Sequence, residues 1–295
     1  MKKFALNLLF FIAIILLINC YFYKIVFENY FNEYEYVDLN NSTYLLSDSH
    51  GLPLEKQNNQ FQFYNFAAGS DSYIDMKRKL QYLVENSKIK RLLISVDNHT
   101  LSIYRDNQNN LDRSNYFAKR NEYSNLYAYL KEKYIERFIP FISPKSRDIL
   151  KINFQLEDNK TKVRKEWNTL SKKEKKAISI KRVKQQFPES NYSTKQKNAL
   201  NDIISICNKN NIELIGIKFP LSNEYLDALD DSNYNSDTLL ISNRIKVYNF
   251  SKQYVNSPAL FKNQDHLNQT GGKMLSLKIY KILQKNDSIA LDKLH

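Results

Sequence analysis

The sequence is short of the residues that build compact metal sites and disulfide frameworks. It has two cysteines, Cys20 and Cys207, together with four histidines, five glycines and one tryptophan in 295 residues. Two cysteines cannot supply a cysteine-based metal site, and a disulfide between them would place one partner in an apolar N-terminal run. The sequence also lacks internal repeats, low-complexity linkers, zinc-finger spacing, a basic leucine zipper and an aromatic nucleic-acid signature.

The net charge of +13 would suit a nucleic acid, an anionic lipid or an acidic glycan. Lysine is spread along the whole chain, however, so the charge reflects composition rather than a dedicated patch. We therefore expect no nucleic-acid partner. Hydrophobic residues make up 42% of the chain and charged residues 25%, which is typical of a folded protein.

The one long apolar run lies at the N-terminus. It extends from Phe4 to Tyr23 after Lys2 and Lys3, and only Asn7 and Asn19 interrupt it. About twenty apolar residues are enough to cross a bilayer as a helix. Positive charge before the run and acidic residues after it predict a single-pass protein with a cytoplasmic N-terminus and an extracytoplasmic C-terminal domain.

A cleaved signal peptide is the alternative for this run. The run is long and no A-x-A-like cleavage site follows it, which favours an uncleaved anchor. We therefore expect a transmembrane anchor over residues 1–24, an aromatic-rich stalk over 25–40 and a folded domain over 41–295.

Short apolar runs alternate with amphipathic segments after residue 40. The expected strands are 43–46, 62–66, 91–96, 212–219 and 245–250. The expected helices are 71–86, 193–208 and 270–284. Strands that alternate with helices of this size predict an α/β fold, with a central parallel sheet of about five strands and helices on both faces.

The segment 102–191 does not follow this alternation. It is mostly helical in pattern and strongly polar, and its part from Arg164 to Gln186 is dense in lysine and arginine around Trp167. We interpret it as a helical insertion between the third and fourth strands. It is either a solvated cap without chemistry, or a lid that shapes a substrate cleft or contacts lipid headgroups or an acidic polymer.

The scarce histidines and glycines gather at strand ends. Two of the four histidines and four of the five glycines lie in three segments: Ser47-Asp48-Ser49-His50-Gly51, Asn65-Phe66-Ala67-Ala68-Gly69-Ser70, and Asp265-His266-Leu267-Asn268 with Gly271-Gly272. His99 closes a further segment that begins at Ile94. Because ligands bind beyond the carboxyl ends of parallel strands, this pattern predicts an active site.

The order of these segments resembles the SGNH (GDSL-like) hydrolase superfamily. Ser47-Asp48-Ser49 matches the Gly-Asp-Ser block of that family, with Ser47 in the glycine position, and Gly69 matches the glycine of the second block. Ser95-Val96-Asp97-Asn98 loosely matches the third block, Gly-x-Asn-Asp, and Asn263-Gln264-Asp265-His266 aligns with the final Asp-x-x-His. The resemblance implies a flavodoxin-like three-layer fold for the chain after residue 40, apart from the insertion.

The resemblance assigns the nucleophile role to Ser49 and the base role to His266. A serine hydroxyl needs a base to take its proton, and a histidine before the last helix can reach the sheet edge to do so. The expected oxyanion donors are the Ser49 amide, the Gly69 amide and the Asn98 side chain. We expect no cofactor and no metal.

Three residues are candidates for the position of the acid that orients His266. Asn263 stands where the family has aspartate, and an asparagine can hold an imidazole tautomer without neutralising an imidazolium. Asp265 adjoins His266, and neighbouring side chains in an extended segment point to opposite sides unless the chain bends. Asp97 is another orienting residue to consider. Otherwise the site works as a dyad or is degenerate.

Asp265-His266-Leu267-Asn268 followed by Gly271 also resembles the version found in anchored bacterial members that decorate cell-envelope polysaccharides. This resemblance implies acyl transfer through an acyl-Ser49 intermediate in the periplasm. The enzyme would be an esterase or an O-acyltransferase acting on carbohydrate or another ester substrate, with a membrane-bound acyl donor as a further partner. The alternative is a non-catalytic glycan-binding or assembly module, which Asn263 favours.

Ordinary structural roles compete with these assignments. Asp48-Ser49-His50 could form a simple turn in which aspartate and serine bond their own backbone. His99 would usually be a packed or surface histidine. Asn268 and Thr270 are expected to cap the final helix rather than bind substrate.

Overall fold

The computed structural model describes residues 1–54, 63–155, 166–188, 192–230 and 232–292, with the backbone alone for 286–292. The chain divides into two compact units. One comprises Met1–Val37 and Asp112–Arg164, and the other comprises Asp38–Leu111 and Lys165–His295. The larger unit contains the sheet and all the candidate active-site residues that were identified from the sequence.

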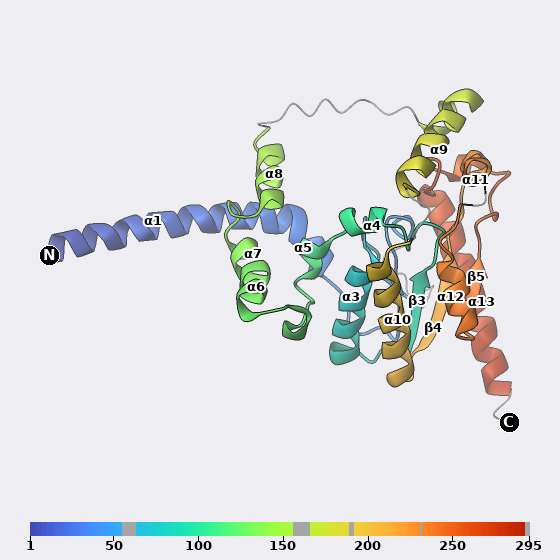
Figure 1. The fold of residues 1–295 in the computed structure, drawn as a ribbon, viewed down its shortest axis with the longest axis horizontal. Coiled ribbons are helices and arrows are strands. Elements are labelled where there is room, and N and C mark those ends of the chain that lie inside the picture. Colours follow the sequence, from blue (N-terminus) through green and yellow to red (C-terminus); the bar gives the residue numbers. More distant parts are fainter. Residues whose placement is uncertain (55–62, 156–165, 189–191, 231, 293–295) are drawn as a thin grey trace. The chain divides into compact units, whose positions relative to one another are not determined.

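The sheet of the larger unit has five strands, all parallel, in the order β2-β1-β3-β4-β5 (Figure 1). The strands are β1 Thr43–Leu46, β2 Tyr64–Asn65, β3 Arg91–Ser95, β4 Glu213–Lys218 and β5 Lys246–Asn249. This is the flavodoxin-like strand order, so the predicted α/β class and sheet are confirmed. The expected second strand begins at Gln62, which lies outside the described residues.

Helices cover both faces of this sheet. The helices of this unit are α3 Tyr73–Asn86, α4 Tyr104–Asn107, α9 Lys172–Gln186, α10 Thr194–Lys209, α11 Asn223–Leu229, α12 Ser236–Ser242 and α13 Gln269–Asp292. Figure 1 shows α3, α10 and α12 on the near side of the sheet and α13 on the far side. Serine residues cap several of them, as expected for helix starts: Ser72 forms a capping box with Asp75, and Ser193 and Ser222 cap α10 and α11.

The core explains why the three central strands, β1, β3 and β4, are mostly continuous apolar runs. On one face, Leu45, Leu93 and Ile215 pack in a cluster with Leu275 and Ile279 of α13. On the other face, Gly216 lies directly beneath Leu240 of α12, where a Cβ would be 2.9 Å from its methyl carbon. Since both faces are covered, both sets of alternating side chains must be apolar. Trp167 belongs to the first cluster and is buried.

Two glycines set the position of α13. A Cβ on Gly272 would overlap the carbonyl oxygen of Pro53, and one on Gly271 would lie 2.5 Å from the carbonyl oxygen of Leu260. The first turn of α13 therefore packs directly on the backbone that follows Ser49. Asn268 caps this helix through the Gly271 amide, as expected.

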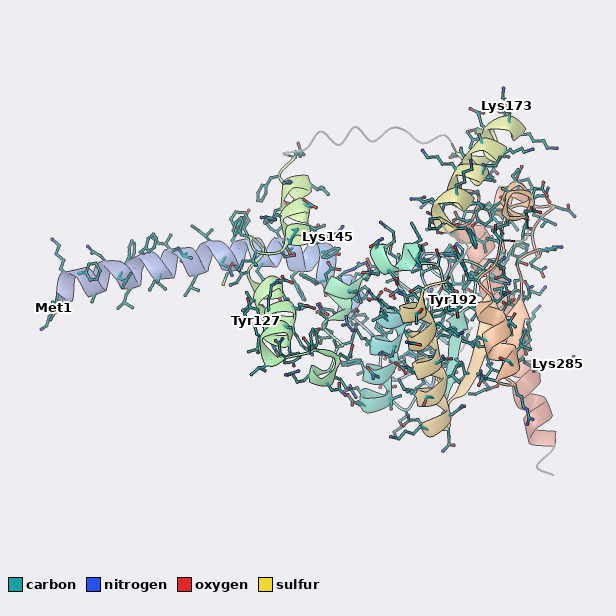
Figure 2. All side chains as sticks on the ribbon, in the orientation of Figure 1. Met1, Tyr127, Lys145, Lys173, Tyr192 and Lys285 are labelled. Atoms are coloured by element: carbon teal, nitrogen blue, oxygen red, sulfur yellow. The ribbon has the colours of Figure 1, made fainter. Side chains whose placement is uncertain are left out.

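The smaller unit is helical. Its helices are α1 Lys2–Val26, a π-helical turn Phe27–Phe31, α2 Asn32–Glu35, α6 Leu126–Leu130, a second π-helical turn Lys131–Ile135, α7 Glu136–Phe138 and α8 Pro144–Asn153, with α5 Leu111–Ser114 and a 3₁₀ turn Arg120–Glu122 leading into it. The helix Lys2–Glu35 is long and apolar enough to be a membrane anchor, although a signal sequence would have the same character. The side chains of α1 stand out along most of its length (Figure 2).

Candidate active site

Ser49 lies on a tight turn at the carboxyl end of β1. The Gly51 amide donates to the carbonyl of Asp48 (3.1 Å), and the His50 amide donates to the Asp48 carboxylate (2.9 Å). These bonds form an Asx-type turn that fixes the backbone around Ser49. The aspartate therefore bonds its own backbone, as the simple-turn interpretation expects. The hydroxyl of Ser49 points elsewhere, toward His266.

His266 reaches Ser49 from a loop 217 positions further along the chain. Its Nε2 lies 2.7 Å from Ser49 Oγ. The loop is closed by backbone bonds from the Lys262 and Asn263 amides to the carbonyl of His266, and by a bridge between Phe261 and Leu267. This closed loop, anchored by the glycine packing of α13, brings the predicted nucleophile and base into hydrogen-bond contact.

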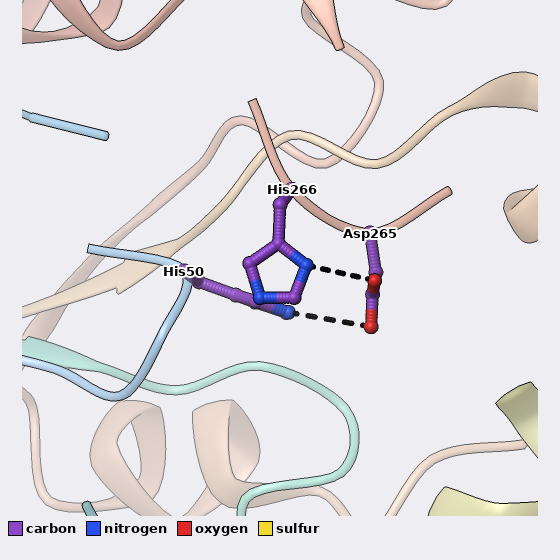
Figure 3. A group of neighbouring side chains, drawn as sticks. All are labelled: His50, Asp265 and His266. Atoms are coloured by element: carbon purple, nitrogen blue, oxygen red, sulfur yellow. Dashed lines mark hydrogen bonds and ion pairs between the residues drawn. The ribbon is translucent and has the colours of Figure 1, made fainter. Parts of the chain in front are cut away.

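Two oxygens accept from the other ring nitrogen of His266. Its Nδ1 lies 2.9 Å from Oδ1 of Asp265 and 2.9 Å from Oδ1 of Asn263 (Figure 3 shows the former). A carboxylate oxygen can only accept, so the proton belongs on Nδ1 and Nε2 is free to accept the serine proton. This is the tautomer that a serine–histidine–acid triad requires. The tight loop turns Asp265 back toward its neighbour, which an extended segment would not do.

The second oxygen of Asp265 is held by the basic helix α9. Arg182 Nε donates to Oδ2 at 2.8 Å, and Gln186 Nε2, one turn further along, lies 3.4 Å away. Gln186 is fixed in turn by the hydroxyl of Tyr225 on α11. The insertion therefore contributes directly to the site, because it orients the carboxylate that orients His266.

A second histidine–aspartate pair lies beside the first. His50 Nδ1 is 2.8 Å from Oδ2 of Asp97, and the amide of Phe219 donates to the other Asp97 oxygen at 2.7 Å. The ring of His50 packs edge-on against that of His266, with centroids 4.9 Å apart. Asp97 thus orients His50 and ties β3 to β4.

A third histidine, His99, lies next to His50 and contacts another aspartate. His99 Nε2 is 3.2 Å from the buried carboxylate of Asp48, which also pairs with Arg105. The rings of His99 and His50 have centroids 5.1 Å apart. Three of the four histidines therefore form one row behind Ser49, alternating with Asp48, Asp97 and Asp265.

The surroundings set the charges of these histidines. Burial alone would lower the pKa of His50, but Asp97 and Asp265 outweigh it and raise the pKa to about 9. Burial lowers the pKa of His266; Asp265 opposes this, and the charges of His50 and Arg182 add to it, so the pKa stays below its ordinary value. At neutral pH His50 is therefore an imidazolium and His266 a neutral base.

The carboxylate and the distal histidine complete the charge pattern. Burial would raise the pKa of Asp265, but His266, His50 and Arg182 together hold it well below the ordinary value. Burial and the charge of His50 lower the pKa of His99 to about 3, so its ring is neutral. Asp265 is therefore an ionised acid beside a neutral base.

The predicted oxyanion donors are less closely grouped. The Ser49 amide donates to no other described residue. Asn98 donates to the carbonyl of Ser232 at 3.2 Å and lines a cavity of about 430 Å³ with Lys218 and Ser251, among others. A Cβ on Gly69 would meet only Leu52, at 3.6 Å, so close packing does not require a glycine there. The roles of Gly69 and Asn98 stay predictions.

Sequence reasoning missed three participants: His50 as a charged partner of the acid, and Arg182 and Gln186 as its ligands. The signal for His50 was its place next to Ser49. The signal for the other two was weaker, namely a polar pair four residues apart in a helical segment.

The geometry of the cluster fits hydrogen bonds better than a metal ion. His50, Asp265 and His266 offer ligand atoms within 4.8 Å of one another, as do Asp48, His50 and Asp97. Ligand atoms about 2.1 Å from a tetrahedral zinc lie roughly 3.4 Å apart. The closest pairs here are instead 2.8 and 2.9 Å apart, which are hydrogen-bond distances.

No family model matches the chain, and no curated protein matches it. Among solved structures, the chain is similar to a protein from Bacteroides fragilis that carries the provisional description of an acylhydrolase, at 9% identity and a TM-score of 0.41, over 89% of this chain and 97% of the other. A likeness at this level carries no conclusion about activity.

Proposed function

We propose that the protein is a serine-dependent enzyme of acyl-ester chemistry, with Ser49 as nucleophile, His266 as general base and acid, and Asp265 as the orienting carboxylate. The single observation that carries this proposal is the continuous hydrogen-bonded path from Ser49 Oγ through both nitrogens of His266 to Asp265. A carboxylate in the third position removes the main reason for preferring a non-catalytic module.

The chemistry has two steps. Ser49 Oγ attacks the ester carbonyl carbon while His266 Nε2 takes the hydroxyl proton, and His266 then gives that proton to the departing alcohol. In the second step a water or a sugar hydroxyl attacks acyl-Ser49, with His266 taking its proton and returning it to Ser49 Oγ. Asp265 stabilises the imidazolium in both steps, and the Ser49 amide is a candidate donor to the oxyanion.

We further propose that this chemistry takes place outside the cytoplasm, on carbohydrate of the cell envelope, with Lys2–Glu35 as an anchor. The support is the charge pattern around the apolar run and the sequence resemblance to anchored bacterial members. A C-terminal fusion to an export-dependent phosphatase should be active in cells. Activity of a cytoplasm-dependent reporter at the same position would contradict the orientation.

Covalent labelling tests the nucleophile. Detergent-solubilised full-length protein should react with a fluorophosphonate probe at Ser49, as mapped by peptide mass spectrometry, and Ser49→Ala should not react. Ser47→Ala is a matched control on the same turn, because the buried Ser47 hydroxyl has no hydrogen-bond partner among the described residues. A folded wild-type protein that neither labels nor hydrolyses p-nitrophenyl acetate would favour the glycan-binding alternative.

A further inference from the structure

The helix Leu126–Phe138 of the smaller unit turns its apolar side chains outward. It comprises α6, a π-helical turn and α7, and it exposes six large hydrophobic residues: Leu126, Tyr127, Leu130, Tyr134, Ile135 and Phe138. Four of these recur at every fourth position and so form one stripe along the helix. Tyr127 is labelled in Figure 2.

Two basic side chains of the same helix face the protein, whereas Lys131 and Glu136 pair at its surface. Arg137 forms a two-pronged ion pair with Glu35, one arm at 2.6 Å, and the two side chains are only 12% and 9% exposed. Its guanidinium also lies over the rings of Phe31 and Tyr116, at 4.8 and 5.2 Å. Lys133 donates to the carbonyl of Ala118 at 2.6 Å. Arg137 and Lys133 are thus turned inward while large apolar side chains are exposed, unlike a water-facing helix whose apolar residues pack on a core.

The exposed apolar surface continues beyond this helix. Ile139, Phe141, Ile142, Ile152 and Phe154 are also exposed, so eleven large hydrophobic residues are exposed between residues 126 and 154. All the described side chains of the larger unit, from residue 38 to 111 and after 165, contribute only seven. We name these eleven residues the apolar face. Such a concentration marks an interaction surface rather than ordinary scatter.

The apolar face adjoins the end of the candidate membrane span. Phe22 of α1 packs edge-on against Phe141 and Phe154, with ring centroids 4.8 and 5.9 Å away, and Tyr23 lies 5.2 Å from Phe138. Asn19 donates to the carbonyl of Phe138 at 2.9 Å. The Asn19 side chain, one of the two polar residues within the apolar run, therefore has a hydrogen-bond partner at the end of the helix Leu126–Phe138. A polar group next to lipid needs such a partner.

We propose that the apolar face docks on the lipid bilayer, in the leaflet where the C-terminal end of α1 leaves the membrane. The proposal rests on the proposed role of Lys2–Glu35 as an anchor. About twenty residues cross the hydrocarbon, so a span that begins at Phe4 ends near Tyr23, at the level of the apolar face.

The composition of the surface favours lipid over a second protein. Tyr127 and Tyr134 are residues typical of the membrane–water boundary, and the exposed basic residues Lys145, Arg147 and Lys151 of α8 suit anionic headgroups. The docked unit would hold the chain against the membrane along one side as well as by its anchor.

Depth-dependent quenching tests this proposal in the full-length chain reconstituted in phosphatidylcholine–phosphatidylglycerol vesicles. Cys20→Ser removes the exposed cysteine, and Cys207 is buried. Single cysteines at Phe138→Cys or Ile142→Cys carry an environment-sensitive nitrobenzoxadiazole label. We expect blue-shifted emission and strong quenching by lipids with a shallow spin label. Lys209→Cys, exposed in the larger unit, should give polar emission without quenching.

A label at Phe10→Cys separates the two proposals. It should be quenched by deeply labelled lipids if α1 spans the bilayer. With Phe10 quenched, polar emission from positions 138 and 142 would overturn the docking proposal alone. Blue-shifted emission there without lipid quenching would overturn it too, in favour of a contact with a second copy of the chain. If Phe10 is unquenched, the anchor and the docking proposal both fail.

Discussion

The ring of His50 and the carboxylate of Asp265 lie side by side at the buried centre of the site, with Nε2 3.9 Å from Oδ2. This Nε2 has no hydrogen-bond partner among the described residues, while the opposite nitrogen is fixed by Asp97. Figure 3 shows that the two histidines approach the same carboxylate. The charge of His50 is therefore part of the environment of Asp265, the proposed acid of the triad.

Protonation of His50 should stabilise the fold. Its pKa in the folded protein, about 9, lies above the ordinary value of 6.5, so its contribution is complete below pH 6.5 and is lost as the pH rises through about 9. The full effect is roughly 3 kcal/mol. The thermal midpoint of the detergent-solubilised protein should fall between pH 6.5 and 9.5, and His50→Gln should flatten this fall. An unchanged fall in His50→Gln would assign it to another group.

Asp265, rather than Asn263, should act as the acid. Asp265→Asn removes the charge that stabilises the His266 imidazolium, and kcat for p-nitrophenyl acetate should drop by about 10³–10⁴-fold. Asn263→Ala removes a neutral acceptor that shares the Nδ1 proton and also accepts from the Asp265 amide at 3.2 Å, and kcat should drop less than about tenfold. Equal losses in the two variants, with unchanged circular dichroism, would show that the asparagine carries the orienting role after all.

Much of this site could be predicted because the ends of buried strands can be recognised in the sequence. Ser49 follows a buried run that ends at Leu46, and parallel strands bring their carboxyl ends to one edge. His266 could be proposed as the base because histidine is rare in this chain and because its segment resembles the last block of a known hydrolase family. The contact between Ser49 and His266 was therefore predictable although 217 positions separate them.

The direction of Asp265 was not predictable in the same way. Neighbouring side chains diverge in an extended segment, and only the closed loop between Lys262 and His266 brings this carboxylate back onto the adjacent ring. The contact of Arg182 with Asp265 could not be predicted for a different reason. The sequence of α9 is basic on most sides, so no periodic pattern shows that Arg182 and Gln186 point inward while Lys181 and Lys184 face solvent.

Arg182 should tune the basicity of His266. Its positive charge lowers the pKa of His266, and Arg182→Gln removes that charge. The base must be neutral to accept the serine proton, so a higher pKa moves the acid limb of the kcat/KM profile to higher pH. Lys181→Gln is the matched control, with the same change of charge on an exposed neighbour. Arg182 acts on the triad only structurally if both variants keep the wild-type profile.

The packing of Gly272 should be more important for the site than that of Gly69. A Cβ on Gly272 would overlap the backbone of Pro53, four residues after Ser49, and neither backbone can move without shifting α13 from the serine turn. Gly272→Ala should therefore cost roughly 3 kcal/mol of stability and most of the activity. Gly69→Ala is the comparison, since its Cβ would meet only Leu52 at 3.6 Å and the amide is kept. It should change the thermal midpoint little and preserve an oxyanion donor at that position. A stable, active Gly272→Ala protein would mean that the loop of His266 is held to Ser49 by something other than the first turn of α13.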